Sequence, residues 1–287
     1  MKKHLLHISL LFLSLLVLAS CTERMSIDLP TANQKLVVEG YLFPGDSSSW
    51  IRLTTTSAYF ANQPPHAVLN ASLGLDDGHE SWVFHPLAQK PGYYFINANE
   101  FTALPGKIYH LNIQLSSPIG NETHFESQTT MPPLRIHIDS IGIQYAPDIK
   151  NWVIRLYARD SVGKDFYLFN SRVNDRLITD SIPRKSVRSD EFFDGRYLHG
   201  LIVQVLNKDE LHPGDLYQLD ASNITEAYYN YIQGLQLEIG NKNPLFSGPP
   251  ANAQGNISGG ALGFFTAFAT TSFRVKLQAS KSINKYN

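Results

Sequence analysis

Short segments in which apolar and polar residues alternate, with turn residues between them, constrain the fold of this chain more than any other feature. About seven such segments precede residue 131, namely 35–43, 49–56, 67–75, 81–87, 92–97, 107–115 and 124–130. A two-residue period puts alternate side chains on opposite faces of a β-strand. The pattern predicts an Ig-like or fibronectin-like antiparallel sandwich, because many short strands at regular spacing are typical of that fold.

Turn residues indicate how the first strands pair. Pro44-Gly45-Asp46 separates the first two segments, and Asp76-Asp77-Gly78 separates the third from the fourth. An Asp-Gly pair accepts the positive φ angles of a type I′ turn. We therefore expect a β-hairpin with a type I′ turn at Asp76-Asp77-Gly78.

Pro132-Pro133 marks the predicted end of this sandwich. Two adjacent prolines donate no backbone hydrogen bonds and do not continue a central strand. Strand-like segments resume after them at 135–145, 151–159, 165–173, 197–206 and 264–277. The sequence therefore predicts an Ig-like domain over residues 35–131 and a second β-rich sandwich domain over residues 134–280.

One segment of the second half has a helical period instead. Apolar residues recur at helical spacing at Ile224, Tyr228, Tyr231, Ile232, Leu235 and Ile239. Asn223, followed three residues later by Glu226, matches a capping box, and Gly240 is a typical helix stop. We expect one helix over about 223–239, with Asn223 as its N-cap.

The N-terminus has the features of a secretory signal peptide. Lys2 and Lys3 precede a largely apolar run over residues 5–18, which is too short to span a bilayer, and the run ends in Leu-Ala-Ser-Cys21. This ending resembles the lipobox of bacterial lipoproteins. Residues 1–20 are therefore predicted to be cleaved, Cys21 to carry acyl (palmitate) chains, and residues 21–34 to form a tether. The alternative is an ordinary cleavage site that precedes a cysteine.

Cysteine usage and charge exclude several classes of protein. Cys21 is the only cysteine, so the mature chain has no disulfide framework and no cysteine-based metal site. After removal of residues 1–20, 22 basic and 25 acidic side chains remain, a formal charge of −3. No basic block is interleaved with aromatic residues, so we expect no nucleic-acid partner.

Glycines are dense in the stretch PPANAQGNISGGALGFF at 249–265. Gly255, Gly259, Gly260 and Gly263 lack the spacing of a phosphate-binding loop, and the β-type run that starts at Phe264 follows instead of a helix. The G-x-S-x-G motif of serine hydrolases is absent as well. We interpret the stretch as a connection that passes close to a sheet. Substitution of Gly259 or Gly260 by valine is expected to lower stability.

The spacing of the histidines and carboxylates matches no known metal-binding or catalytic motif. The histidines of the mature chain occur singly, without an H-E-x-x-H motif, at His66, His79, His85, His110, His124, His137, His199 and His212. No D-x-D-x-D-G calcium loop occurs. A pair of acids from distant strands stays open as a source of glycoside chemistry. We expect no cofactor, no metal and no catalytic residue.

Several segments together resemble the Bacteroidetes lipoprotein family called domain of unknown function 4249. They are LVVEGYL near residue 40, AYFANQPP (58–65), TTMPP (129–133), DSVGKDFY (160–167), ITEAYYNYIQGL (224–235) and NPLFSGPPANAQGNISGGALGFFTAF. In the last of these, Gly255, Asn256, Gly259, Gly260 and Gly263 form the family signature. The resemblance implies an envelope lipoprotein with an Ig-like first domain, often encoded near TonB-dependent outer-membrane receptors, and implies no established activity.

These observations lead to three hypotheses of function. The first is a non-enzymatic accessory or binding lipoprotein, anchored to the outer membrane through Cys21 and associated with a TonB-dependent receptor. The second is an envelope glycan hydrolase with carboxylates from distant strands, and the third is a purely structural envelope protein. Residues 22–26 lack the run of acids associated with surface export, so both the periplasmic and the surface-facing orientation stay open.

Overall fold

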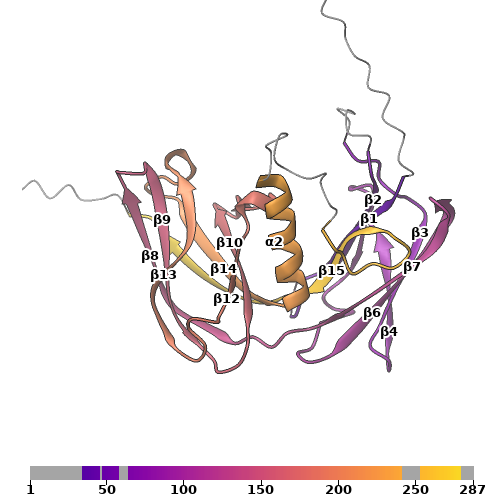
Figure 1. Cartoon of the computed structure of the whole chain (residues 1–287), viewed down its shortest axis with the longest axis horizontal. Coiled ribbons are helices and arrows are strands. Elements are labelled where there is room, and N and C mark those ends of the chain that lie inside the picture. The colour runs from indigo at the N-terminus through magenta and orange to yellow at the C-terminus, as the bar shows by residue number, and fades with distance from the viewer. Residues whose placement is uncertain (1–33, 46, 58–63, 241–252, 279–287) are drawn as a thin grey trace, which may run out of the picture. The chain divides into compact units, whose positions relative to one another are not determined.

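The computed structural model describes residues 34–45, 47–57, 64–240 and 253–278 (Figure 1). It is mainly β, with several sheets in a sandwich-like arrangement and one α-helix. The predicted fold class is therefore confirmed. Among the described residues, no helix is long and apolar enough to cross a bilayer.

An eight-stranded sheet is formed mostly by the first half of the chain. Its strands are β1 (Leu36–Leu42), β2 (Ser49–Thr55), β3 (Ala71–Asp76), β4 (Ser81–Pro86), β5 (Tyr93–Ile96), β6 (Ile108–Ile119), β7 (Glu122–Thr130) and β15 (Leu262–Ala267). They follow the order β15-β1-β2-β5-β4-β3-β6-β7, and every pair is antiparallel except β1 with β15. The edge strands β15 and β7 also contact each other, so the sheet curls around its own core.

The alternation of apolar and polar residues in the sequence determines which side chains form this core. In β1, the side chains of Leu36, Val38 and Leu42 are buried, while Val37, Glu39 and Tyr41 between them are partly exposed. The corresponding buried positions of β2 are Ile51 and Leu53. Burial of each such aliphatic side chain contributes about 1.5–3 kcal/mol, so the period-two pattern alone selects the inward face.

The expected hairpin between β3 and β4 is confirmed, but its predicted turn type is wrong. Asp76 pairs with Ser81, which leaves four residues in the loop, and only Gly78 has a positive φ there (82°). A type I′ turn needs two positive φ angles. Instead, the Asp77 side chain accepts hydrogen bonds from the backbone N–H groups of His79 (3.0 Å) and Glu80 (2.9 Å).

The second half forms a sandwich of two further sheets. The smaller has the order β13-β9-β8, and the larger has the order β11-β10-β14-β16 with β12 also paired to β10. Their strands are β8 (Ile136–Ala146), β9 (Asn151–Asp160), β10 (Phe166–Val173), β11 (Arg176–Leu177), β12 (Ser186–Ser189), β13 (Tyr197–Asn207), β14 (Leu216–Ile224) and β16 (Ala269–Lys276), with short 3-10 turns η1 (Ile182–Arg184) and η2 (Lys208–Glu210). A core that includes Leu156, Phe169 and Leu219 lies between the two sheets.

The helix begins later than expected. It is α2 (Glu226–Gly240), and Asn223 belongs to the end of β14. The Asn223 side chain accepts a hydrogen bond from the Arg135 N–H (2.9 Å) and donates one to Asp165 (3.1 Å), so it is not the N-cap. The Thr225 hydroxyl instead accepts from the Tyr228 N–H (3.2 Å). Buried Tyr228 and Ile232 pack against Phe166, Leu168 and Val187 of the larger sheet.

The predicted strand at 264–277 is two strands in two different sheets. Residues 262–267 pair with β1 of the first sheet, residues 269–276 pair with β14 of the second sandwich, and only Phe268 lies between them. The predicted domain limits stay a prediction. The structure adds that residues 262–267 of the expected second domain are part of the first sheet.

The glycine-rich stretch runs along the edge of this first sheet. The Asn256 side chain accepts a hydrogen bond from the Phe265 N–H (2.8 Å) and donates to the Phe265 carbonyl (2.7 Å). The Ser258 hydroxyl accepts from the Glu126 N–H (2.7 Å) of β7. The stretch therefore links edge strands β7 and β15, as an architectural connection.

Two glycines of this stretch lie where no side chain fits. At Gly263, with φ at 99°, a Cβ atom would overlap the Val38 carbonyl oxygen of β1, and at Gly255 it would overlap the Gly263 carbonyl oxygen. A Cβ at Gly259 (φ 64°) would lie 3.0 Å from the Phe125 ring, whereas a Cβ at Gly260 (φ 69°) would meet open space. The steric constraint is therefore strongest at Gly255 and Gly263.

We predict that Gly263→Ala lowers the free energy of unfolding by about 3 kcal/mol or more, because β15 must move away from β1. Gly260→Ala is the matched control. Its added Cβ meets no neighbouring atom, so only the positive φ angle is unfavourable, and the free energy of unfolding should fall by about 1–2 kcal/mol. Denaturant unfolding of both variants measures the difference. Equal losses of unfolding free energy in the two variants would contradict a specific steric constraint at Gly263.

Candidate functional site: a basic pocket beside the helix

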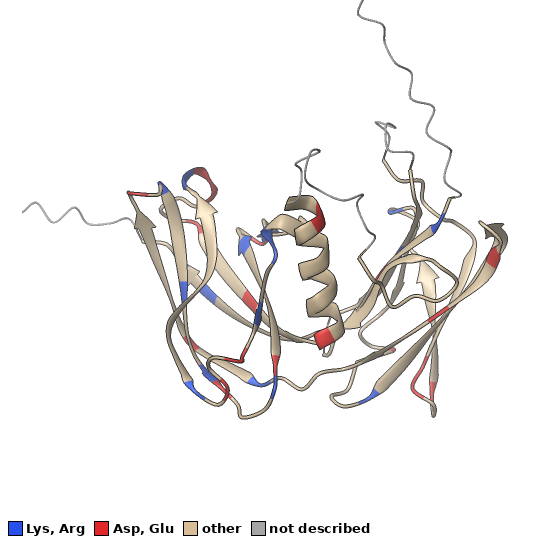
Figure 2. Ribbon diagram, viewed as in Figure 1, with Lys and Arg blue, Asp and Glu red and all other residues tan. Residues whose placement is uncertain are grey.

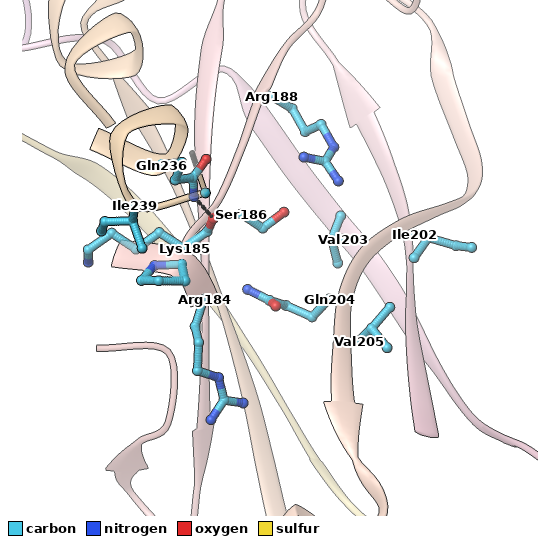
Figure 3. A pocket seen from close by; sticks show the side chains of 12 residues that line it. Arg184, Lys185, Ser186, Arg188, Ile202, Val203, Gln204, Val205, Gln236 and Ile239 are labelled. Carbon is cyan, nitrogen blue, oxygen red and sulfur yellow. Dashed lines mark hydrogen bonds between the residues drawn. The ribbon is translucent and has the colours of Figure 1, made fainter. Parts of the chain in front are cut away.

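A solvent-open pocket of about 490 Å³ lies where four elements of the second sandwich meet. η1, β12, β13 and the last turns of α2 supply its lining (Figure 3). The volume falls within the range of small-molecule sites. The pocket is therefore large enough for a ligand, and its chemistry decides which kind.

The register of β12 aims two polar side chains into this pocket. Ser186 pairs with Phe169 and Arg188 with Tyr167 on β10, and both of these aromatic rings face the core between the two sheets. Val187 between them instead packs beneath α2. Because directly paired residues share a face, Ser186 and Arg188 point toward the smaller sheet, and Figure 3 shows them on the side of β13.

Two hydrogen bonds hold the end of the helix against the pocket wall. The side-chain amide of Gln236 donates to the Ile182 carbonyl (2.9 Å) and to the Lys185 carbonyl (2.7 Å). These bonds satisfy carbonyl groups in the turn between η1 and β12. They also fix the position at which Arg184, Lys185 and Ser186 enter the pocket.

The lining carries three basic side chains, Arg184, Lys185 and Arg188, and no acidic one. Along the whole ribbon, Lys and Arg positions (blue) and Asp and Glu positions (red) occur in both halves of the chain (Figure 2). Arg184 forms a bidentate pair with Glu210 (2.5 and 2.9 Å). Burial lowers the pKa of Lys185, while the charges of Asp180 and Glu39 act to raise it. Arg188 donates to the Val187 carbonyl (2.8 Å), which leaves further guanidinium N–H groups to face the pocket.

Ser186 and Gln204 add neutral polar groups to the pocket lining. The Ser186 hydroxyl oxygen is buried and has no hydrogen-bond partner within the described ranges. Gln204 donates one amide N–H to the Phe169 carbonyl (2.9 Å), so its second N–H remains to be used. Figure 3 shows the Gln204 amide nitrogen on the side of Ser186. The pocket lining therefore holds hydrogen-bond donors besides its basic side chains.

Apolar side chains complete the walls. Ile202 and Val205 of β13 are 41% and 47% exposed, and Ile239 at the end of α2 is 38% exposed. Their neighbour Val203 is buried in the core of the sandwich. The pocket thus combines a positively charged, donor-rich side with an aliphatic side.

None of these pocket residues is among the candidates that the sequence supplied. The local signal was Arg184-Lys185-Ser186-Val187-Arg188, with three basic residues in five. Gln204, Gln236 and the aliphatic wall come from other elements, and only the fold brings them together. Cys21 lies outside the described residues, and the signature residues of the glycine-rich stretch lie in the sheet connection.

A cluster of carboxylates lies at another place in the same sandwich. Oxygen atoms of Asp160, Asp190 and Asp194 lie within 4.8 Å of one another. Oxygen ligands of this kind suit Ca²⁺ or Mg²⁺. Each carboxylate also accepts a backbone hydrogen bond, from Gly195 N–H (2.9 Å), Asp165 N–H (2.8 Å) and Gly163 N–H (2.8 Å) respectively, which orders the two loops. No histidine of the described residues joins the cluster.

Asp165 borders this cluster and titrates unusually. Burial raises its pKa to about 6, the Arg135 guanidinium 3.6 Å away acts to lower it, and the charges of Asp160 and Asp190 act to raise it. Burial likewise raises the pKa of Asp190. Tyr167 donates to the Asp160 carboxylate, and burial raises the pKa of Tyr167 further above its usual range. Burial at this place therefore disfavours the charged forms of Asp165 and Asp190.

A polar pocket of about 600 Å³ lies on the outer face of β3, β6 and β7. Asp76 and Glu126 both line it, but the register puts them two strands apart and two residues out of line, because Asp76 pairs with His110 and Glu126 with Asn112. Standard sheet spacings then separate their Cα atoms by about 12 Å. Glu126 also pairs with His124 (2.9 Å), and Asp76 accepts from the Gly78 N–H (3.2 Å). Each carboxylate therefore has a hydrogen-bond partner outside the pair.

We predict that Asp165→Asn reduces the pH dependence of stability. The folded pKa of Asp165 is about 6, above the unfolded value of 3.8, so its stabilising contribution is complete below pH 4 and is lost as the pH rises through 6. Asparagine does not ionise and still accepts from Asn223. The loss between pH 4 and pH 7 should be smaller in the variant, by at most about 3 kcal/mol.

Denaturant unfolding at both pH values measures this difference. Parallel stability profiles of Asp165→Asn and the wild type would contradict the prediction.

Comparisons with known proteins give a family and a distant structural match. The three N-terminal domains of the Highly Immunogenic Outer Capsid protein (Hoc) of bacteriophage RB49 are 10% identical, with a TM-score of 0.23, over 86% of this chain and 71% of that chain. Comparison with curated proteins found no match. The model of the family described as domain of unknown function (DUF4249) matches residues 22–274, and the chain belongs to that family.

Proposed function

We propose that this chain is a lipid-anchored binding protein of the cell envelope. In this proposal, Cys21 holds it at the outer membrane, and the sandwich domains act as a non-enzymatic accessory to a TonB-dependent receptor. The single observation that carries the binding role is the basic pocket, which is open to solvent and is lined by donors and by exposed aliphatic side chains. The anchoring role rests on the Leu-Ala-Ser-Cys21 ending of the apolar run.

The glycan hydrolase alternative has less support from the geometry. Retaining and inverting glycosidases hold their two carboxyl groups about 5–9.5 Å apart across the sugar. Asp76 and Glu126 line one pocket, but their strand positions put their Cα atoms about 12 Å apart, and each carboxylate has a separate hydrogen-bond partner. A purely structural role does not account for the concentration of positive charge and unused donors in the basic pocket.

We predict that Cys21→Ala moves the protein from the membrane fraction to the aqueous fraction. Each buried acyl CH₂ contributes about 0.8 kcal/mol to membrane attachment, so loss of the acyl chains removes the anchor. Metabolic labelling with a palmitate analogue, followed by fractionation, measures both effects. Ser26→Ala in the tether is the control and should keep label and membrane attachment. Labelled, membrane-bound Cys21→Ala protein would contradict the anchor.

We also predict that the lipidated chain, purified from gently solubilised envelopes, carries an outer-membrane receptor at near-stoichiometric amounts. Quantitative mass spectrometry of the purified material, with the Cys21→Ala chain as the comparison, measures the association. Recovery of the lipidated chain without any stoichiometric membrane partner would argue against the accessory role.

A further inference from the structure

We propose that the basic pocket binds an organic anion with an aliphatic portion. The acid group lies at Arg188 and Ser186, and the aliphatic portion lies along Ile202 and Val205. This inference rests on the proposed binding role and adds the ligand class. It follows from four features of the pocket: its charge, its unpaired hydroxyl, the direction of the helix and its apolar wall.

The first feature is uncompensated positive charge. Glu210 neutralises Arg184 through two hydrogen bonds, whereas no carboxylate lines the pocket beside Arg188. The planar guanidinium of arginine matches carboxylate and phosphate oxygens and forms charge-assisted bonds with them. Arg188 is therefore the group that selects an acid.

The second feature is the buried Ser186 hydroxyl. Four side-chain oxygens in the described part of the chain are buried without a hydrogen-bond partner, and the Ser186 oxygen is the one that lines this pocket. A buried polar group without a partner costs about 1–3 kcal/mol. A ligand oxygen beside Arg188 would accept from this hydroxyl and remove that cost.

The third feature decides where in the pocket the acid lies. α2 ends at Gly240 in the pocket wall, and a helix C-terminus carries partial negative charge. That end repels an anion. Arg188 and Ser186 lie on β12, and the Gln204 side chain extends from β13 toward the β12 side of the pocket (Figure 3). The acid group is therefore directed to the β12 side.

The fourth feature is the aliphatic wall. Ile202 and Val205 expose 41% and 47% of their surface on an edge strand of the smaller sheet. An inorganic anion would leave these side chains in water. An acid with an alkyl portion covers them, and each buried CH₂ strengthens binding about threefold to fourfold.

Isothermal titration calorimetry on the full lipidated chain in phosphatidylcholine nanodiscs tests the proposal, with empty nanodiscs as the blank. Hexanoate and hexyl phosphate are the probes, and they separate a carboxylate from a phosphate as the acid. Hexanol lacks the acid, and inorganic phosphate lacks the alkyl portion. We expect at least one of the two hexyl acids to bind at least tenfold more tightly than hexanol and inorganic phosphate.

Variants locate the site. Arg188→Gln should weaken binding of the hexyl acid about tenfold or more, and Ser186→Ala about threefold. Lys35→Gln, which removes one exposed charge from the start of the first sheet, should leave the affinity unchanged. Circular dichroism checks that each variant is folded. Equal affinity in the wild type and folded Arg188→Gln would overturn the proposal, as would hexanol or inorganic phosphate binding as tightly as the hexyl acids.

The outcome is separable from that of the proposed function, because the calorimetry contains no receptor. If the hexyl acids fail to bind while the lipidated chain still carries its receptor, the ligand class is wrong and the accessory role stands. If they bind at Arg188 but no receptor is recovered, the ligand class stands and the accessory role falls.

Discussion

The chain from Leu262 to Lys276 pairs with β1 in the first sheet and with β14 in the second sandwich, with only Phe268 between the two pairings. Its backbone hydrogen bonds therefore stabilise both halves of the protein at once. The Asn256 amide holds Phe265 by its N–H and its carbonyl, and Gly263 lets β15 approach β1 without a clash. These contacts involve few atoms, but the position of β15 at the edge of the first sheet depends on them.

The pocket depends on the same segment through the helix. Phe264, within the β15 pairing, and Phe268, directly after it, pack with Tyr228 of α2. The helix in turn covers Val187 and holds the turn before β12 through Gln236. A shift of β15 would therefore move α2, and with it the face of β12 that carries Ser186 and Arg188. The glycine-rich stretch supports the site without contributing an atom to it.

Local patterns were sufficient to predict most strands, because the period of two is a property of neighbouring residues. They failed where a residue's partner lies far away in the sequence. Asn223 looked like an N-cap beside Glu226, but its amide bonds to Arg135 and Asp165, and its backbone is still paired within β14. β14 itself was missed, because strand residues such as Gln218 and Asp220 are polar yet buried. The pocket and the carboxylate cluster were missed for the same reason, since each combines side chains from separate elements.

The second sandwich retains charged and polar groups in places that reduce its stability. Burial raises the pKa of Asp165 and lowers that of Lys185, so each is less stable in its charged form, and the Ser186 hydroxyl is buried without a partner. Groups of this kind are expected where function opposes stability. The carboxylate cluster and the basic pocket differ in what could offset this loss of stability. In the cluster, backbone N–H groups of the protein already donate hydrogen bonds to the carboxylates. Ser186 and Arg188 instead line a solvent-open pocket, where in the proposed site a bound acid supplies the acceptor.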